Sequence, residues 1–410
     1  MQYTVHKPIA LNTDIQLPAS KSISNRALII NALCKNAGTI ENLSDADDTR
    51  VMLQALTTDQ NIIDVEAAGT SMRFLTAYFA SQPGERIITG TARMKNRPIA
   101  LLVNALRQIG ADIDYVEKEG YPPLRIKGKT LEGGQITLDG SVSSQFISAL
   151  MMIAPATQNG LVIKLEGQIV SKPYIRMTQH LMEIFGIKVS WTDHTISIPP
   201  QPYHPVSFMV ENDWSAASYW YEILSLAETG SEITLKGLHK KSFQGDAKIA
   251  QLFEVLGVST KFTEKGAVLQ KTERLVSPLM YNFQHEPDLA QTFVVTCALK
   301  NVPFQFSGLQ SLKIKETDRM IALQNEMKKL GYTLAITEDH EISWAGVRAH
   351  PEKILPIRTY EDHRMAMSFA PAALVVGEIA VQDPEVVSKS YPSYWKDLEK
   401  AGFRIEVCNK

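Results

Sequence analysis

The chain has 410 residues, of which 44% are hydrophobic and 21% are charged. These values are typical of a globular protein that is large enough for two domains, each with its own core. The formal net charge at pH 7 is −2, so no overall basic field would attract nucleic acid or an anionic membrane surface. We therefore expect neither as a partner, and any anion site must be local.

The cysteines, the N-terminal residues and the longest apolar run indicate the cellular compartment in which the protein is expected. Three cysteines, an odd number without metal-ligand spacing, argue against a disulfide framework and favour a reducing compartment. The first residues alternate like a strand and lack the apolar core of a signal peptide. The apolar run at 365–381 is interrupted by Pro371, Gly377 and Glu378, so we predict a buried helix followed by a strand. A cytoplasmic protein is the expectation.

Residues 18–33 (PASKSISNRALIINAL) join a polar, cationic tip to an apolar helix. The tip contains four residues of types that cap helix N-termini, Ser20, Ser22, Ser24 and Asn25. Lys21 and Arg26 lie within about one turn of them. Because a helix N-terminus carries partial positive charge, this combination suits a phosphate or carboxylate. An ordinary capped helix with two solvated cations is the alternative for this stretch taken alone.

An internal repeat organises the whole chain. Amphipathic helices that end in a glycine and lead into a strand recur roughly every 70 residues, with the glycines at Gly110, Gly186, Gly257, Gly331 and Gly402. More apolar helices lie between them and are predicted to begin near Ser22, Thr70, Ser144, Asp213, Asp288 and Glu361. The chain therefore contains six α/β units, each with a buried helix, an outer helix and several strands. Two groups of three units are expected, with a boundary in the proline-rich segment 199–211.

Cationic and hydroxyl side chains gather at the predicted helix starts of the first half. Gly69 and Thr70 open a helix whose backbone amides can receive an anion, and cations follow at Arg73, Arg93, Lys95 and Arg97. Two further starts carry Ser143, Ser144 and Gln145, and Ser171, Lys172 and Tyr174. Capping alone explains each start taken singly. Together with the start that carries Lys21 and Arg26, four such starts at equivalent places in the repeats favour anion binding.

The second half adds groups that can transfer protons. Asp288 precedes a buried helix, and in KETDR we predict Lys315 and Arg319 on one helical face with Glu316 beside them. A surface ion-pair ladder is the alternative for KETDR alone. Asp362, His363 and Arg364 run directly into a buried helix, where charge is costly unless it is paired. This last placement favours function.

The usual metal and cofactor motifs are absent from the sequence. The nine histidines are scattered, and neither a metal-ligand spacing, a GxGxxG fingerprint nor a GxxxxGK[ST] loop occurs. A serine nucleophile with a histidine partner is also unsupported. We therefore expect no metal and no organic cofactor, and the remaining chemistry is anion binding with proton transfer.

Eight motifs together resemble the 5-enolpyruvylshikimate-3-phosphate (EPSP) synthase family. They are SKSISNR, AGTSMR, RMKNRP, GSVSSQF, SKPYI, KETDR, DHRMAM and SKSYP, in the order and approximate spacing of that family and across nearly the whole chain. The resemblance implies a two-domain enolpyruvyl transferase fold with three βαβαββ units in each domain. It also implies that residues 1–20 and 212–410 form one domain and residues 21–211 the other.

The resemblance implies an activity as well. The family transfers the enolpyruvyl group of phosphoenolpyruvate to the 5-hydroxyl of shikimate 3-phosphate and releases phosphate, in the shikimate pathway of aromatic amino acid biosynthesis. By motif match, shikimate 3-phosphate would be held by Lys21, Ser22, Arg26, Ser143, Ser144, Gln145, Ser171, Tyr174, Asp288 and Lys315. Phosphoenolpyruvate would be held by Lys21, Gly69, Arg97, Gln145, Arg319, Arg364 and Lys389.

The implied mechanism is addition and elimination through a tetrahedral intermediate in a cleft between the domains. Asp288 would take the proton of the attacking hydroxyl, and Glu316 with Lys21 would protonate and later deprotonate the substrate carbon. Both substrates are small molecules, and we expect the protein to be a monomer. This sequence departs from the common family pattern at Ala67, Phe74 and Ser311, so sensitivity to the inhibitor glyphosate is not inferred.

Two other functions stay open at this point. The related transferase that acts on UDP-N-acetylglucosamine should carry a Lys-Asn pair near the first helix and a reactive loop cysteine, whereas Ser22 follows Lys21 here and RMKNRP contains no cysteine. A non-catalytic phosphoshikimate-binding protein would need no proton-transfer groups, which argues against it because Lys21, Asp288 and Glu316 are all present.

Overall fold

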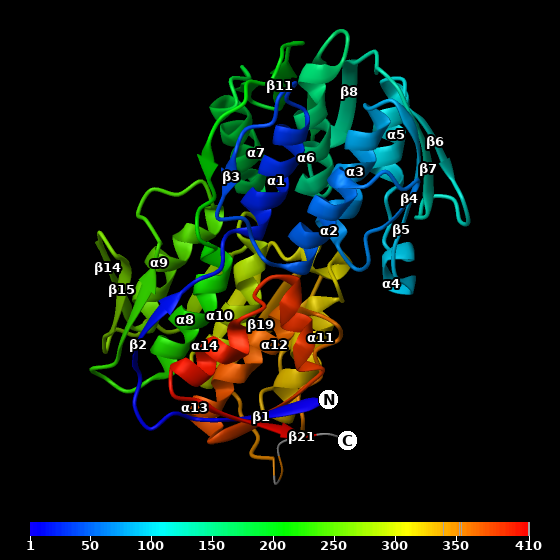
Figure 1. Ribbon diagram of the computed structural model, residues 1–410. Coiled ribbons are helices and arrows are strands. Elements are labelled where there is room, and N and C mark those ends of the chain that lie inside the picture. The colour runs from blue at the N-terminus through cyan, green and yellow to red at the C-terminus, as the bar shows by residue number, and fades with distance from the viewer. Residues whose placement is uncertain (339, 352, 354, 409–410) are drawn as a thin grey trace. The chain divides into compact units, whose positions relative to one another are not determined.

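The chain divides into two compact units in the computed structural model, which describes residues 1–338, 340–351, 353 and 355–408 (Figure 1). The terminal unit comprises Met1–Pro18 and Glu211–Lys410, and the central unit comprises Ala19–Val210. Each unit has its own apolar core.

The central unit is built from two four-stranded sheets, a short two-stranded sheet and the helices that pack on them. The sheets have the strand orders β4-β5-β7-β6, β8-β9-β11-β10 and β12-β3. The strands are β3 (Ile40–Glu41), β4 (Ile62–Asp64), β5 (Gly84–Thr89), β6 (Asp112–Tyr115), β7 (Leu124–Gly128), β8 (Gly134–Asp139), β9 (Leu161–Glu166), β10 (Ser190–Thr192), β11 (Thr195–Ile198) and β12 (Phe208–Met209). The helices are α1 (Lys21–Ala32), α2 (Asp47–Thr57), α3 (Gly69–Ala80), α4 (Ala92–Lys95), α5 (Ala100–Gln108), α6 (Ser144–Ile153) and α7 (Lys172–Ile184).

The terminal unit repeats the same arrangement. Its sheets have the orders β2-β13-β15-β14, β16-β17-β19-β18 and β20-β1-β21. The strands are β1 (Gln2–His6), β2 (Asn12–Gln16), β13 (Glu232–Lys236), β14 (Val258–Thr263), β15 (Gly266–Lys271), β16 (Leu279–Asn282), β17 (Phe304–Ser307), β18 (Ala335–Thr337), β19 (Glu341–Trp344), β20 (Glu378–Gln382) and β21 (Arg404–Cys408). The helices are α8 (Trp214–Leu226), α9 (Ile249–Leu252), α10 (Ala290–Leu299), α11 (Arg319–Lys329), α12 (His363–Phe369), α13 (Ala373–Val376) and α14 (Tyr394–Lys400).

One pairing pattern recurs in all four four-stranded sheets. When the strands of a sheet are counted in chain order, the first pairs in parallel with the second. The second is antiparallel to the fourth, and the fourth is antiparallel to the third. A parallel pair needs a crossover connection, and the buried helices α3, α6 and α10 supply it between β4 and β5, β8 and β9, and β16 and β17. An outer helix then leads to the third strand. This βαβαββ unit confirms the expected fold class.

The last unit of the chain is completed by the N-terminal strand. β1 lies between β20 and β21 and is antiparallel to both, while Ile357 forms a parallel bridge to Val381 of β20. β1 therefore takes the place of the fourth strand, although it comes first in the chain. In Figure 1 the blue N-terminal strand accordingly lies beside the red C-terminal one.

The helix boundaries follow from local signals in the sequence. α3, α6, α8, α10 and α12 are buried along nearly their whole length, as the many apolar and small residues in them predict. The glycines after the outer helices all have positive φ angles, from 85° at Gly186 and Gly257 to 100° at Gly110. A glycine takes this left-handed conformation without strain and so ends each helix.

The apolar run at 365–381 forms α12, a short 3₁₀ turn, α13 and the start of β20. The sequence prediction of a helix followed by a strand is confirmed. Among the described residues, no helix combines the length and the apolar character that crossing a membrane requires.

Two lysines of the terminal unit converge on one backbone carbonyl. The Nζ atoms of Lys271, on β15, and Lys300 both donate to the carbonyl oxygen of Ser225, the latter at 2.9 Å. Burial and the neighbouring Lys300 cation lower the pKa of Lys271 to about 7. Its ordinary pKa of 10.5 returns on unfolding, so the unfolded chain binds more protons between about pH 7 and 10.5, and stability rises with pH across this window.

Replacing Lys271 with methionine is therefore expected to stabilise the protein at pH 7. Lys300 still donates to Ser225, so no carbonyl loses its partner. Because Lys271 is only half-buried, solvent screening limits the gain to about 1 kcal/mol. Urea unfolding at pH 7 and pH 9 should show that the free energy of unfolding rises less with pH in the variant than in the wild type. Lys261→Met, at an exposed position on β14, is the control, and equal pH slopes in Lys271→Met and wild type would contradict the assignment.

Candidate active site

The KETDR segment brings a cation to the centre of the terminal unit. Asp318 caps α11 by accepting hydrogen bonds from the backbone N–H groups of Met320 and Ile321, so the helix begins only at Arg319. Lys315 precedes the helix in an extended conformation. The prediction that Lys315 and Arg319 share a helical face is therefore wrong, because the aspartate between them starts the helix after Lys315.

Arg319 is the hub of a buried ion-pair network. Its side chain is 2% exposed, and its Nε and Nη2 donate to the two carboxylate oxygens of Asp362 at 2.7 and 3.3 Å. Nη2 also donates to Glu316 at 2.8 Å, and Nη1 donates to Asp288 at 3.2 Å. Burial alone would lower the pKa of Arg319, but the carboxylates of Asp362, Glu316 and Asp288 raise it above the ordinary value.

Asp288 joins three cations. Besides Arg319, its carboxylate accepts hydrogen bonds from Nη2 of Arg364 at 2.9 Å and from Nζ of Lys315 at 3.4 Å. Burial raises the pKa of Asp288, but the charges of Arg364, Lys315 and Arg319 outweigh it and hold the pKa well below the ordinary value. A carboxylate that is strongly perturbed by specific charge partners marks a candidate functional position.

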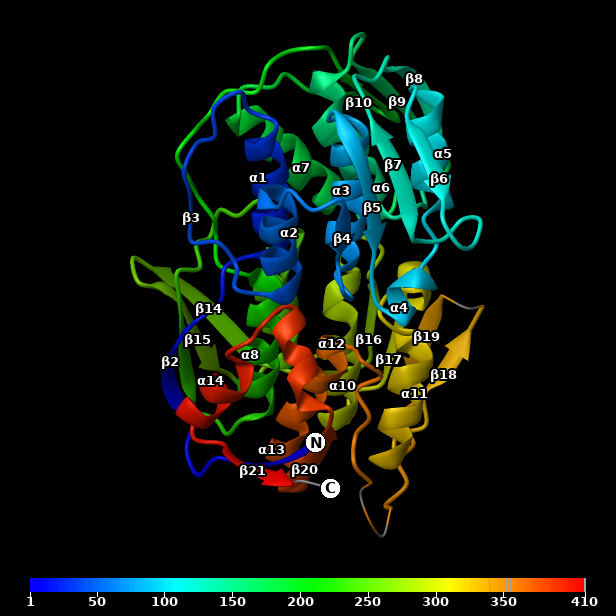
Figure 2. The ribbon, with the colours of Figure 1, turned by 45° about the vertical axis from the view of Figure 1, so that its right-hand side comes forward.

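Arg364 is fixed by the start of α12. Asp362 caps this helix by accepting a hydrogen bond from the backbone N–H of Arg364 at 2.9 Å. The guanidinium also donates to the hydroxyls of Tyr219 and Ser215, both on α8, at 3.3 Å. α11 and α12 thus each supply an arginine of this network from their first two residues, and Asp288 lies in the 3₁₀ turn just before α10. Figure 2 shows these three helices in the terminal unit. Lys389 stands at the edge of this network, where its Nζ donates to the carbonyl of Glu361 at 2.8 Å.

In the central unit, α1 presents Lys21 at its first turn. Ser20 caps the helix by accepting a hydrogen bond from the backbone N–H of Ile23. The Nζ atom of Lys21 lies 3.4 Å from the carboxylate of Asp48, and the two side chains are 15% and 9% exposed. The cation is therefore held in one place by a buried partner.

Arg26 is buried one turn further along α1. Its guanidinium donates to the hydroxyl of Thr178 at 2.7 Å, to the carbonyl of Ser22 at 2.8 Å and to the hydroxyl of Ser148 at 3.2 Å. Burial lowers its pKa to about 10. Phe74 lies beneath the guanidinium, with the ring centroid 5.2 Å away, so the phenylalanine that departs from the family pattern packs directly on a predicted binding residue.

Two arginines flank the start of α3. Arg73 donates to the carbonyl of Gly69 at 2.9 Å. Nη1 of Arg97 lies so close to Gly69 that a Cβ atom at this position would come within 2.3 Å of it. The buried Nε of Arg97 has no hydrogen-bond partner among the described residues. A helix N-terminus with adjacent guanidinium groups favours an anion.

The other predicted residues of the central unit also lie at helix starts. Ser143 caps α6, and the amide of Gln145 donates to the hydroxyl of Thr70 at 3.2 Å, which links the starts of α6 and α3. Ser171 precedes α7 with a φ of 53° and makes no side-chain capping bond. A non-glycine residue costs about 1 kcal/mol or more in this conformation, and such strain is concentrated at functional sites.

Sequence comparison places the chain in a family. The family described as EPSP synthase (3-phosphoshikimate 1-carboxyvinyltransferase) matches residues 5–58 and 56–398. A 3-phosphoshikimate 1-carboxyvinyltransferase of Bacteroides fragilis is 58% identical over 408 residues, which cover 99% of each chain. The protein of that name from Vibrio cholerae is 38% identical, with 96% of this chain and 98% of the relative covered. The chain belongs to the EPSP synthase family.

Solved structures agree on the fold. An EPSP synthase from Acinetobacter baumannii superimposes with a TM-score of 0.77 at 20% identity, covering 99% of this chain and all of that one. The resemblance inferred from the eight motifs is confirmed, as is the two-domain enolpyruvyl transferase fold. Membership of the EPSP synthase family also favours the main interpretation of the sequence over both alternatives.

The structure brings most of the predicted EPSP synthase residues of the terminal unit together, and fewer of those of the central unit. In the terminal unit one network joins Asp288, Lys315, Glu316, Arg319 and Arg364. In the central unit the links are fewer. Arg26 is joined to Ser22 and Tyr174 through backbone carbonyls, and Arg97 adjoins Gly69.

Several partners of these residues were not identified from the sequence. Asp48, which pairs with Lys21, lies in an acidic run that is typical of a solvated helix start. Tyr219 and Ser215, which accept hydrogen bonds from Arg364, lie on an apolar helix. The sequence pattern of that helix predicts a core element and gives no sign of a functional contact. No local pattern could have found them, because each contact joins segments far apart in the sequence.

A glycine-to-alanine substitution at Gly69 tests the anion site at α3. The added Cβ would displace the end of the Arg97 side chain, which is flexible and can move away. We expect the KM for phosphoenolpyruvate to rise about tenfold, the loss of roughly one charge-assisted hydrogen bond, while the fold is kept. Steady-state kinetics checks this. An unchanged KM for phosphoenolpyruvate in Gly69→Ala would contradict the placement of Arg97.

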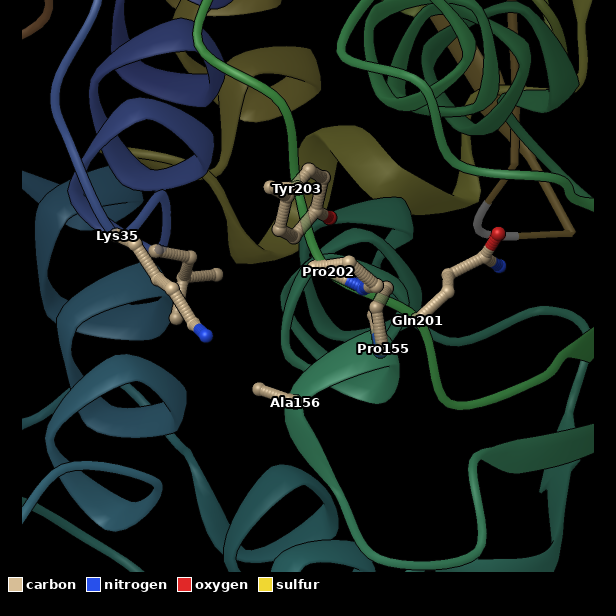
Figure 3. Close-up of a pocket in the computed structure, with 7 residues that line it drawn as sticks. Lys35, Pro155, Ala156, Gln201, Pro202 and Tyr203 are labelled. Carbon is tan, nitrogen blue, oxygen red and sulfur yellow. The ribbon is translucent and has the colours of Figure 1, made fainter.

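A separate cavity lies in the central unit (Figure 3). It has a volume of about 330 Å³ and is lined by Leu33, Lys35, Pro155, Ala156, Gln201, Pro202 and Tyr203. None of the predicted EPSP synthase site residues is among them. Among the described residues, no three or more His, Cys, Asp or Glu side chains are arranged so that they could hold a metal ion.

Proposed function

We propose that this chain transfers the enolpyruvyl group of phosphoenolpyruvate to the 5-hydroxyl of shikimate 3-phosphate and releases phosphate. The observation that carries the proposal is the network of Asp288 and Glu316 with three cations in the terminal unit. Both substrates are multiply anionic, which accounts for the cations. Proton-transfer groups beside them account for a reaction rather than binding alone.

Both units would contribute substrate contacts. Shikimate 3-phosphate is assigned to Lys21, Ser22, Arg26, Ser143, Ser144, Gln145, Ser171, Tyr174, Asp288 and Lys315. Phosphoenolpyruvate is assigned to Lys21, Gly69, Arg97, Gln145, Arg319, Arg364 and Lys389. The units, with boundaries proposed after residues 20 and 211, would close on the substrates, and closure would exclude water and strengthen each charge contact.

The chemistry of addition follows from the network around Asp288. Without ligand, its carboxylate is a weak base because Arg364, Lys315 and Arg319 stabilise its charge. Phosphoenolpyruvate brings negative charges that compete for Arg319 and Arg364. Asp288 is then less stabilised and becomes a stronger base, so it can take the proton of the 5-hydroxyl as the oxygen attacks carbon 2 of phosphoenolpyruvate.

Glu316 and Lys21 would complete the proton transfers. Glu316 protonates the methylene carbon during addition, which yields a tetrahedral intermediate with a methyl group. Elimination then breaks the bond from carbon to the phosphate oxygen, and Glu316 removes one methyl proton to form the enolpyruvyl ether. Arg97, Arg319 and Arg364 would clamp carboxylate and phosphate, because the planar guanidinium fork matches both groups.

Phosphate release from purified protein tests this function. Release that requires both phosphoenolpyruvate and shikimate 3-phosphate, and that fails with UDP-N-acetylglucosamine, is the expected result. Release with UDP-N-acetylglucosamine would support the related transferase, and release with neither acceptor would support a binding protein. The cytoplasmic location and the monomeric state expected from the sequence belong to the same proposal.

A further inference from the structure

The segment before Arg364 has a strained backbone. Tyr360 and Glu361 are consecutive non-glycine residues with φ angles of 55° and 56°. Each residue in this left-handed region costs about 1 kcal/mol or more, and such a pair persists only where its surroundings hold it. The strained pair immediately precedes Asp362, which caps α12 and binds Arg319. The backbone at 360–361 therefore sets where Asp362 and Arg364 lie.

Glu326 of α11 holds this segment from one side. Its carboxylate, which is fully buried, accepts hydrogen bonds from the hydroxyl of Tyr360 at 2.7 Å, from the backbone N–H of Arg358 at 3.0 Å and from Nζ of Lys329 at 2.5 Å. Burial and the Glu326 carboxylate raise the pKa of Tyr360 to about 12, so its hydroxyl remains a donor at neutral pH. Lys329 also donates to the carbonyl of Pro356 at 2.8 Å.

Two other contacts complete the support. Two turns before Glu326, at the start of the same helix, Arg319 binds Asp362. α11 thus contacts the segment on both sides of the strained pair, at Arg358 through Glu326 and at Asp362 through Arg319. Lys389, a third proposed ligand of phosphoenolpyruvate, donates to the carbonyl of Glu361 at 2.8 Å. The strained backbone at Glu361 therefore also orients the carbonyl that binds Lys389.

We propose that Glu326, acting through Tyr360, is a positioning residue for the phosphoenolpyruvate half of the site. It touches no substrate. It keeps the strained turn formed, and the turn places Asp362, Arg364 and the carbonyl that binds Lys389. This inference rests on the proposed function, because it takes Arg319, Arg364 and Lys389 as the ligands of phosphoenolpyruvate, whereas Asp288 and Lys315 hold shikimate 3-phosphate.

Tyr360→Phe is the direct test, because it removes only the hydroxyl that binds Glu326. A hydrogen bond to a charged group is lost, so we expect the KM for phosphoenolpyruvate to rise about 10- to 100-fold. The KM for shikimate 3-phosphate should rise by a clearly smaller factor, because the turn reaches Asp288 only through Arg319 and Arg364. A loss of general stability would instead affect both substrates alike. Glu326→Gln should give the same split, which covers the case in which one variant folds poorly.

Tyr221→Phe is the matched control. It also removes a hydroxyl hydrogen bond within the terminal unit, between Tyr221 and Thr260 at 2.9 Å, and it should leave both KM values unchanged. Equal shifts of the two KM values in Tyr360→Phe, or no shift in either, would overturn the inference.

Hydrogen exchange gives a second readout that does not depend on activity. The backbone N–H of Arg364 donates to the carboxylate of Asp362, and its protection should fall in Tyr360→Phe but not in Tyr221→Phe. If wild-type protein released no phosphate, the proposed function would fail, and the exchange measurement would still decide the inference. Unchanged protection of Arg364 in Tyr360→Phe would overturn it.

Discussion

Replacing Glu316 with glutamine is expected to lower turnover by about 100- to 10,000-fold, the range contributed by general acid–base catalysis. The glutamine carbonyl can still accept the hydrogen bond from Arg319 that the carboxylate accepts at 2.8 Å, so the network should keep its shape. Binding of shikimate 3-phosphate should therefore be largely intact. The rate of phosphate release at saturating substrates, together with equilibrium binding, measures the two quantities separately.

Glu254→Gln is the control for this substitution. Glu254 is exposed, and its ion pair with Arg274 is long, at 3.8 Å, so neutralising it should leave turnover unchanged. Wild-type turnover in Glu316→Gln would remove Glu316 from the mechanism. A large loss of binding in that variant would instead make it a substrate-holding residue.

The largest effect on stability is expected from Arg319→Met. This change removes one cation that three carboxylates share, and it leaves the fully buried Asp362 without its principal partner. Removing one member of a buried ion pair costs about 3–5 kcal/mol. Urea unfolding should show this loss, whereas Arg404→Met, at an exposed residue paired with Glu406, should change stability by less than about 1 kcal/mol.

The cause of the loss can be checked with a second substitution. If the cost comes from an unpaired buried carboxylate, adding Asp362→Asn to Arg319→Met should recover part of the stability. A double variant that is less stable than Arg319→Met would contradict this explanation.

Acid should weaken the same network. The pKa of Asp288 is lower in the folded protein than in the unfolded chain. The ion pairs of this carboxylate therefore stabilise the fold fully at pH values above its unfolded-state pKa, and this stabilisation is lost as the pH falls through its folded-state pKa.

Much of the fold could be predicted because its signals are local. The buried helices begin where capping residues meet apolar runs, as at Ser143 before α6 and Asp213 before α8. The outer helices end at glycines such as Gly110 that adopt a left-handed conformation. These features recur with the period of the repeat, so a correct prediction of the elements in one unit applies to the other units as well. The motifs likewise contain five members of the charged network in the terminal unit, which are Lys315, Glu316, Arg319, Asp362 and Arg364.

The rest depends on contacts that sequence spacing does not encode. KETDR indicated two cations on one helical face, whereas Asp318 starts the helix after Lys315. The pairing of Lys21 with Asp48 joins two separate helices. The strain at Tyr360 and Glu361 has no sequence signal, because both residue types ordinarily avoid positive φ angles. Tertiary packing alone imposes these arrangements.

A crystal structure with shikimate 3-phosphate bound would test the central claim most directly. That claim is that the central and the terminal units each supply part of one substrate site. The predicted result is a single ligand that contacts Lys21 and Ser171 of the central unit and also Asp288 and Lys315 of the terminal unit. A ligand bound wholly within one unit, with the other unit's residues out of reach, would contradict the account.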